Sequence, residues 1–137
     1  MTDDKTADSS SSTRVSVYCV HFDGDGRVLL VKDANSLLWG FPGGGIDAGE
    51  THDDALHREL TEETGLIMRG SSTYIARQES GTRLRHFYKI EYADGQLNET
   101  GNGDDILEAG YFDVRSLPSD MAIGVEKIIV QQVTLLR

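Results

Sequence analysis

Apolar and polar positions along the chain predict strands, a polar helix, further strands and a last apolar helix. Residues 14–22 and 28–32 are apolar on both faces, which is typical of strands covered on both sides of a sheet. An Asp-Gly-Asp-Gly turn at residues 23–26 separates them, so we expect a hairpin. Further strands are expected at residues 72–79, 83–92 and 110–114.

The polar helix is predicted over residues 52–64. Thr51 is a suitable N-cap, and Asp54 stands three residues later, as in a capping box. Gly65 can adopt the left-handed conformation that ends a helix. Before this helix, the glycine run that follows Pro42 is expected to be irregular and to bring backbone close to a ligand.

A last helix is predicted from about residue 120 to the end of the chain. Its apolar side chains recur at helical spacing, and its other face is not basic, so it should pack on the sheet. The apolar stripe consists of Met121, Val125, Ile128, Ile129, Val133 and Leu136. Residues 1–13 are polar and serine-rich and are expected to be a disordered tail, which leaves residues 14–137 as a single domain.

Three glutamates of the polar helix, Glu59, Glu62 and Glu63, stand at i, i+3 and i+4 and therefore share one face. Such carboxylates repel one another unless something neutralises them. A solvated acidic face is one interpretation of this spacing. A site for a hard cation such as Mg²⁺ or Mn²⁺ is the other, and the glycine run before the helix favours it.

The net charge of −10, from 23 acidic and 13 basic residues, argues against a nucleic-acid-binding surface. A phosphorylated substrate would be repelled by so acidic a protein unless a divalent metal made the site locally positive. The single cysteine, Cys19, is expected to be a buried apolar filler. No membrane span and no secretory signal are found, so a cytoplasmic location is expected by default.

The region from Gly44 to Leu66 fits the pattern G-x5-E-x7-R-E-U-x-E-E-x-G-U, where U is a bulky aliphatic residue. Every fixed position matches: Gly44, Glu50, Arg58, Glu59, Leu60, Glu62, Glu63, Gly65 and Leu66. This resembles the signature of the Nudix hydrolases, which cleave nucleoside diphosphates linked to another moiety. The resemblance implies an α/β fold, an α/β/α sandwich with a mixed β-sheet, and the order of predicted elements is compatible with it.

The resemblance also implies roles for residues of this chain. Glu59 is expected to help activate the attacking water, with Arg58 orienting it and Glu50 as the partner of Arg58. The metal, Mg²⁺ or Mn²⁺, is expected to be held by Glu59, Glu62 and Glu63 and by the carbonyl of Gly44.

Outside the signature, the resemblance implies a further acid from the loop before a late strand. Asp105 and Glu108 are the two alternatives, and Glu108 is equally well explained as a solvated loop residue. Arg85 and Phe87, on the strand expected at 83–92, are candidate substrate contacts.

The expected substrate is a small nucleotide, and a nucleoside triphosphate is preferred, which makes the protein a pyrophosphohydrolase. No proline occurs between Gly65 and Leu117, which weakens an ADP-ribose assignment. The alternatives are another conjugate, such as a nucleotide sugar, and a non-catalytic nucleotide- or RNA-binding Nudix module, although such a module should have lost signature glutamates. An isoprenoid diphosphate isomerase would require a differently placed cysteine. Both a monomer and a homodimer remain open.

Overall fold

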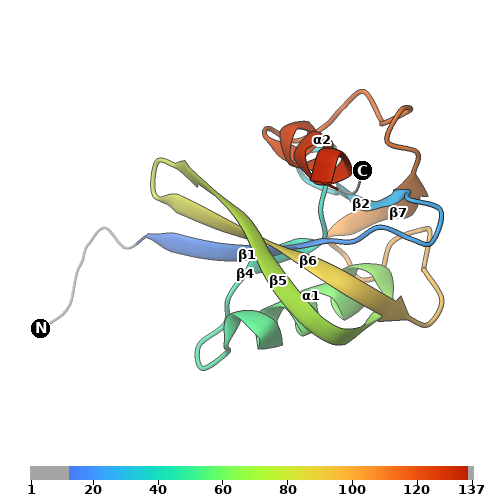
Figure 1. Ribbon diagram of the computed structural model, residues 1–137. Helices are drawn as coiled ribbons and strands as arrows, with labels where there is room; N and C mark the ends of the chain where they lie inside the picture. The colour runs from blue at the N-terminus through green and yellow to red at the C-terminus, as the bar shows by residue number, and fades with distance from the viewer. Residues whose placement is uncertain (1–12, 136–137) are drawn as a thin grey trace, which may run out of the picture.

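The structure is a computed structural model that describes residues 13–135. Most of the polar tail predicted at residues 1–13, and Leu136 of the apolar stripe, lie outside the described residues. Two small β-sheets lie between two helices (Figure 1).

The larger sheet has four strands in the order β4-β1-β6-β5. These are β1 (Arg14–Val20), β4 (Gly43–Gly45), β5 (Ile67–Ser80) and β6 (Arg83–Asp94). β1 runs parallel to β6, while β4 and β5 are antiparallel to their neighbours. The mixed β-sheet expected from the sequence is therefore confirmed.

The smaller sheet is antiparallel, with the order β3-β2-β7. Its strands are β2 (Val28–Asp33), β3 (Trp39–Gly40) and β7 (Ile106–Phe112). The chain does turn at residues 23–26, but the hairpin prediction was wrong beyond a single bridge between Phe22 and Val28. The reason is that β1 pairs with β6 and β4, whereas β2 pairs with β3 and β7, so the two strands enter different sheets.

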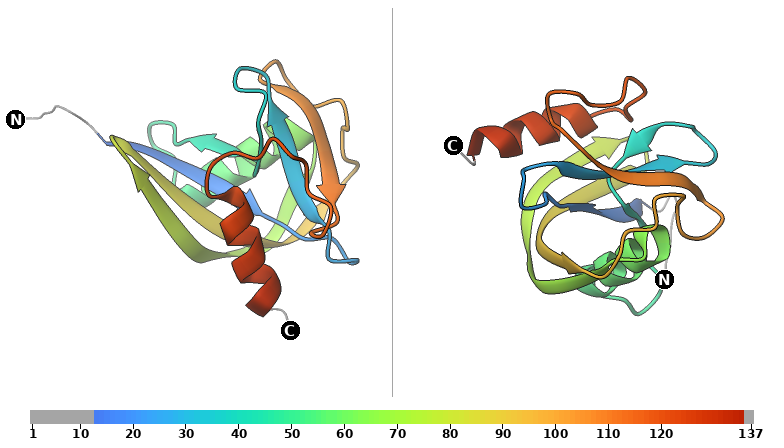
Figure 2. Two further views of the ribbon diagram at one scale, coloured as in Figure 1. Left: turned by 90° about the horizontal axis from the view of Figure 1, so that it is seen from above. Right: turned by 90° about the vertical axis from the view of Figure 1, so that its right-hand side faces the viewer.

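The helices cover opposite sides of the strands, as the two views in Figure 2 show. α1 (His52–Thr64) packs its Leu56 and Leu60 onto a core that includes Val17 of β1. α2 (Val125–Leu135) packs Ile128 and Ile129 onto a second core around Phe87 and Val20. The α/β/α layering is thus confirmed, and the predicted apolar stripe faces the sheet. Among residues 13–135 no helix has the length and apolar character needed to cross a membrane.

Several boundaries differ from the prediction. β5 begins at Ile67, directly after α1, and β7 covers 106–112 rather than 110–114. α2 begins at Val125 because Gly124 has a positive φ of 85°, which interrupts any helix continuing back to residue 120.

The glycine run was predicted to be irregular, and this prediction was wrong: it forms strand β4, which pairs with β1. The close approach of β4 to β1 explains why glycine occupies this strand. A Cβ on Gly43 would collide with the Val17 carbonyl oxygen and with Tyr18, so only glycine allows the two strands this close approach.

Candidate active site

Helix α1, which bears the predicted acidic face, is capped at both ends. The Thr51 hydroxyl accepts a hydrogen bond from the Asp54 N–H at 3.0 Å, and the Asp54 carboxylate accepts one from the Thr51 N–H at 3.1 Å. Gly65 ends the helix with φ 80° and donates its N–H to the Thr61 carbonyl at 3.0 Å. The capping box and the glycine terminus are both confirmed, and they fix where the glutamates stand.

Arg58 connects the helix to the loop before it. Its Nε and Nη2 donate to the two carboxylate oxygens of Glu50 at 2.7 and 2.9 Å, and Nη2 also donates to the Gly45 carbonyl at 2.9 Å. Its Nη1 lies 3.3 Å from Glu59 Oε1 and 3.2 Å from Glu62 Oε1. The hydrogen bonds from Arg58 lower the pKa of Glu50 to about 2, so this bidentate pair stays ionised at any physiological pH.

Glu59 lies in the tightest part of the site and is only 8% exposed. Its carboxylate occupies the space where Gly44 has no side chain, and a Cβ on Gly44 would collide with Glu59 Oε2. Burial raises the pKa of Glu59 to about 7; the charge of Arg58 opposes this rise and that of Glu62 adds to it. Gly44 therefore leaves the space that the Glu59 carboxylate occupies, and both residues belong to the signature.

Glu63 bridges the helix and strand β4. The Gly43 N–H donates to Glu63 Oε1 at 3.0 Å. Burial raises the pKa of Glu63 to about 8, and the negative charges of Glu59, Asp33 and Asp105 act in the same direction. Glu63 is thus a partly buried carboxylate that faces other acids.

The buried carboxylates fit a divalent cation by their chemistry. Glu59 and Glu63 offer hard oxygen donors, and burial, with a smaller effect of neighbouring acids, raises the pKa of both carboxyl groups. Among residues 13–135, no three His, Cys, Asp or Glu side chains are grouped tightly enough to hold a metal ion as they stand. Glu62 is the exposed member of the three glutamates, and its Oε1 lies 3.2 Å from Arg58 Nη1. A cation would therefore be held first by Glu59 and Glu63, with Glu62 free to join.

Of the two loop acids, Asp105 is the one placed near this group. It stands directly before β7, its carbonyl accepts the Ala34 N–H at 2.8 Å, and its charge raises the pKa of Glu63. Glu108 instead lies within β7, opposite Lys32, with an exposed side chain. The geometry favours Asp105.

Sequence reasoning missed Asp33, whose charge also raises the pKa of Glu63. Asp33 ends β2, and its carboxylate accepts the N–H groups of Asn35 and Ser36 at 3.0 and 2.7 Å. An aspartate that caps a turn in this way directly after an apolar strand is a sequence signal that could have identified it.

Cys19 is a buried filler, as predicted. It has no exposed surface, and its Sγ lies 3.7 Å from the Leu56 carbonyl. Burial and the charges of Glu63 and Glu59 raise the pKa of its thiol far above the usual range, so it is not a thiolate nucleophile.

A cavity of about 700 Å³ adjoins the carboxylates, and Glu63 and Gly43 are part of its wall. Three aromatic rings form an apolar side. Tyr18 stacks on Phe87 with ring centroids 5.3 Å apart, and Phe41 meets Phe87 edge to face at 5.8 Å. The size and the mixture of apolar rings and a carboxylate are suited to a nucleotide.

Both residues predicted to contact substrate line this cavity. Phe87 belongs to the aromatic group just described, and Arg85 lies two positions earlier on β6. Gln78 of β5 lies opposite Arg85 and also lines the cavity.

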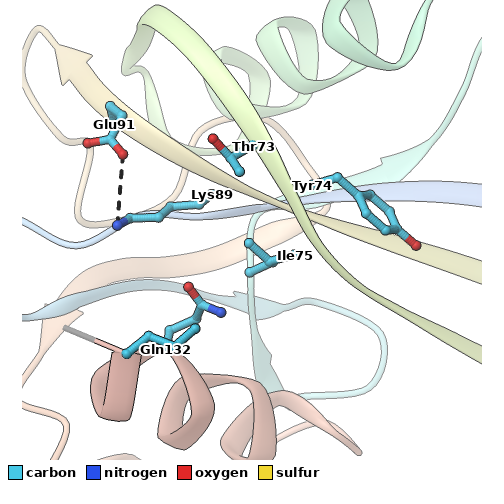
Figure 3. A pocket seen from close by; sticks show the side chains of 7 residues that line it. Thr73, Tyr74, Ile75, Lys89, Glu91 and Gln132 are labelled. Atoms are coloured by element: carbon cyan, nitrogen blue, oxygen red, sulfur yellow. Dashed lines mark ion pairs between the residues drawn. The ribbon is translucent and has the colours of Figure 1, made fainter. Parts of the chain in front are cut away.

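A second cavity, of about 430 Å³, lies between the sheet and α2 (Figure 3). Lys89 and Glu91 of β6 line it, with Lys89 Nζ 3.8 Å from Glu91 Oε1, and Gln132 of α2 faces them. Of the residues that the structure describes, none from the 44–66 signature lines it. The larger of these two cavities is the one that a signature residue, Glu63, lines.

Comparison with known families gives a match over most of the chain. The profile of the NUDIX domain matches residues 12–132. The chain therefore belongs to the Nudix family.

Relatives by sequence carry hydrolase names. An ADP-ribose pyrophosphatase from Methanocaldococcus jannaschii is 36% identical over 113 residues, which cover 77% of this chain and 64% of that protein. An RNA pyrophosphohydrolase from Halorhodospira halophila is 46% identical over 57 residues, covering 42% of this chain and 32% of the relative. The chain thus spans less than two thirds of the length of either protein.

Solved structures share the fold. The NUDIX domain of NrtR from Shewanella oneidensis, solved with ADP ribose, superposes with a TM-score of 0.75 at 21% identity, covering 92% of this chain and 90% of that one. A MutT Nudix hydrolase from Burkholderia pseudomallei gives a TM-score of 0.73 at 24% identity, covering 86% and 96%. At these identities the likeness concerns the fold alone.

Proposed function

We propose that the protein is a divalent-metal-dependent hydrolase that cleaves a phosphoanhydride in a nucleoside diphosphate linked to another group. One observation carries the proposal. Glu63 belongs both to the buried carboxylates of α1 and to the wall of the 700 Å³ cavity, so a nucleotide in the cavity would present its phosphates to those acids. Family membership supports the same reaction class.

Glu59 and Glu63 would hold the cation, with Glu62, the Gly44 carbonyl and Asp105 as further donors. When bound, the cation, Mg²⁺ or Mn²⁺, supplies positive charge that stabilises the phosphate oxygens as the anhydride bond breaks. Glu59 is buried beside Gly44 and is the residue we assign to accept a proton from the attacking water.

Arg58 does not face the cavity in this scheme. Its donors are used by Glu50, Gly45 and the adjoining glutamates, so its task is to hold the glycine strand and helix α1 in register. Glu50 is therefore a positioning residue that acts through Arg58.

A nucleoside triphosphate remains our first prediction for the substrate. The second candidate is ADP-ribose, which is favoured by the ADP-ribose pyrophosphatase of Methanocaldococcus jannaschii at 36% identity. The net charge of −10 supports a small molecule over RNA, although the shorter match to RNA pyrophosphohydrolases makes a 5′-triphosphate RNA a useful comparison.

The test is a product assay on nucleoside triphosphates, ADP-ribose, a nucleotide sugar and a 5′-triphosphate RNA, each with Mg²⁺, with Mn²⁺ and with chelator. We expect metal-dependent release of phosphate or pyrophosphate, or of two monophosphates from a conjugate. Glu63→Gln serves as the inactive control. If no member of the panel is cleaved above the rate of Glu63→Gln, the proposal is wrong.

A further inference from the structure

One end of the cavity is lined by Arg83 and Arg85 together with Glu79, and the hydrolysis described above does not use these residues. Arg85 lines this end and, within residues 13–135, forms no ion pair with a carboxylate. In a protein with a net charge of −10, an arginine of this kind in a substrate cavity has most of its donors available for a ligand.

Arg85 is held by a short chain of polar contacts. Its Nη1 donates to Gln78 Oε1 at 3.4 Å, and Gln78 Nε2 donates to the Ile123 carbonyl at 3.4 Å. Gly124 makes room for this arrangement, because a Cβ there would collide with Gln78 Nε2. The tip of the β5–β6 hairpin is thereby connected to the segment that precedes α2.

The strand register orders the groups along the cavity. Tyr18 is paired with Gly43 on one side and with Phe87 on the other, and Gly43 is the residue that binds Glu63. Arg85 is two residues from Phe87 on the same face, which places it about 7 Å further along the sheet. A path from the carboxylate to the guanidinium therefore runs across the strands over the aromatic rings and then along β6.

This order matches the parts of a nucleotide. With the phosphates at Glu63 and the nucleoside over Tyr18 and Phe87, the group that reaches Arg85 is the far edge of the base. A guanidinium has only donors, and its best partner among base edges is the O6 and N7 acceptor pair of guanine or hypoxanthine. Adenine places an N6 amino donor where O6 would be, so it lacks this pair.

We propose that Arg85, positioned by Gln78, makes the protein selective for nucleotides with a 6-oxopurine base over those with adenine. This inference rests on the proposed function, whose reaction it narrows to a substrate class, and it weighs against ADP-ribose as the substrate.

Binding of GMP, IMP and AMP, measured by calorimetry in Mg²⁺, tests the inference without any turnover. These ligands contain no anhydride, so the result is independent of the hydrolysis assay. GMP and IMP should bind about 5- to 150-fold more tightly than AMP, the ratio that one bidentate pair to a base gives. IMP shares O6 and N7 with GMP but lacks its 2-amino group, so it isolates the edge assigned to Arg85.

Arg85→Gln should abolish this preference by weakening GMP and IMP while leaving AMP nearly unchanged. Gln78→Leu should reduce it by a smaller factor, because Arg85 remains but is less well held. Arg115→Gln is the control: it removes the same charge from a residue that pairs with Asp113, and neither member of that pair lines the cavity.

Three outcomes would overturn the inference. One is equal affinity of the wild-type protein for all three monophosphates, or no binding of any. Another is an equal loss for all three in Arg85→Gln, which would place the guanidinium on the phosphate. The last is a preference that survives unchanged in Arg85→Gln. Each can occur while the protein still hydrolyses its substrate, so the proposed function is judged separately.

Discussion

The acidic helix face and the wall of the cavity are built in opposite ways. The helix face comes from one continuous segment, Gly44 to Leu66, whose spacing on a single helix places its acids together. The cavity wall is assembled from strands of both sheets, from Glu63 of α1 and from the segment before α2, which meet only in the folded protein. We infer that the first part sets the chemistry and the second sets which molecule undergoes it.

The strongest challenge to this division is Glu63→Gln. Glu63 is the residue shared by both regions, and its loss should lower turnover by about 10³-fold, as the removal of a group that stabilises the transition state does. Glu126→Gln, an exposed change on α2, is the control and should have no effect. Circular dichroism should show both variants folded; normal turnover of Glu63→Gln would separate α1 from the chemistry.

Gly44→Ala tests whether the helix face depends on the strand beside it. The new Cβ would displace the Glu59 carboxylate, and a shift of about 1 Å in a reacting group costs roughly 10²-fold in rate. Gly45→Ala is a close control because its Cβ would point into open space. Comparable rates for the two variants would show that the position of Glu59 is not critical.

Asp105→Asn and Glu108→Gln ask whether an acid outside helix α1 also contributes to the chemistry. We expect Asp105→Asn to lower kcat about 10-fold with KM nearly unchanged, because Asp105 acts on Glu63 and not on the nucleobase of the substrate. Glu108→Gln should be neutral. Steady-state kinetics on both would decide, and a loss confined to Glu108→Gln would reverse our assignment.

The smallest expected effect is on stability and concerns the helix face alone. Glu59 and Glu63 have pKa values of about 7 and 8 in the folded protein, above the usual 4.5, so the folded state binds more protons than the unfolded chain between these limits. Without metal, stability should therefore fall as the pH rises from about 5 to 8, a change of several degrees in Tm. Thermal melts in chelator at pH 5.5, 7 and 8.5 check this.

Mg²⁺ should reverse that loss at pH 8.5 and have little effect at pH 5.5, because it binds the ionised carboxylates. Glu63→Gln should show a shallower pH dependence than the wild type. A Tm that rises with pH in chelator would contradict the assigned environment of both glutamates.

The sequence predicted α1 well because every determinant is local. Thr51, Asp54 and Gly65 act within a few residues of the helix, and the spacing of its glutamates needs no partner. The layered fold could likewise be predicted, but only because the signature pointed to a family.

What failed depended on partners distant in sequence. The run Gly43–Gly45 looked irregular because nothing in it shows that β1 would accept it as a strand. The turn at 23–26 looked like a hairpin because local pattern cannot reveal that β1 pairs with β6. Asp33 was missed because its nearness to Glu63 of α1 arises only in the folded chain, although its position as a turn cap was a local signal.

The parallel pairing of β1 with β6 has a consequence for the order of folding. It pairs Arg14 with Arg83, so the whole segment between them must close into a long loop. Such a contact forms slowly. Helix α1 can form early, but the bond between Gly43 and Glu63 requires β4, and β4 requires β1. During refolding we therefore expect the far-ultraviolet circular dichroism signal of the helices to return before hydrolase activity does. The refolding chain would then pass through a helical but inactive state.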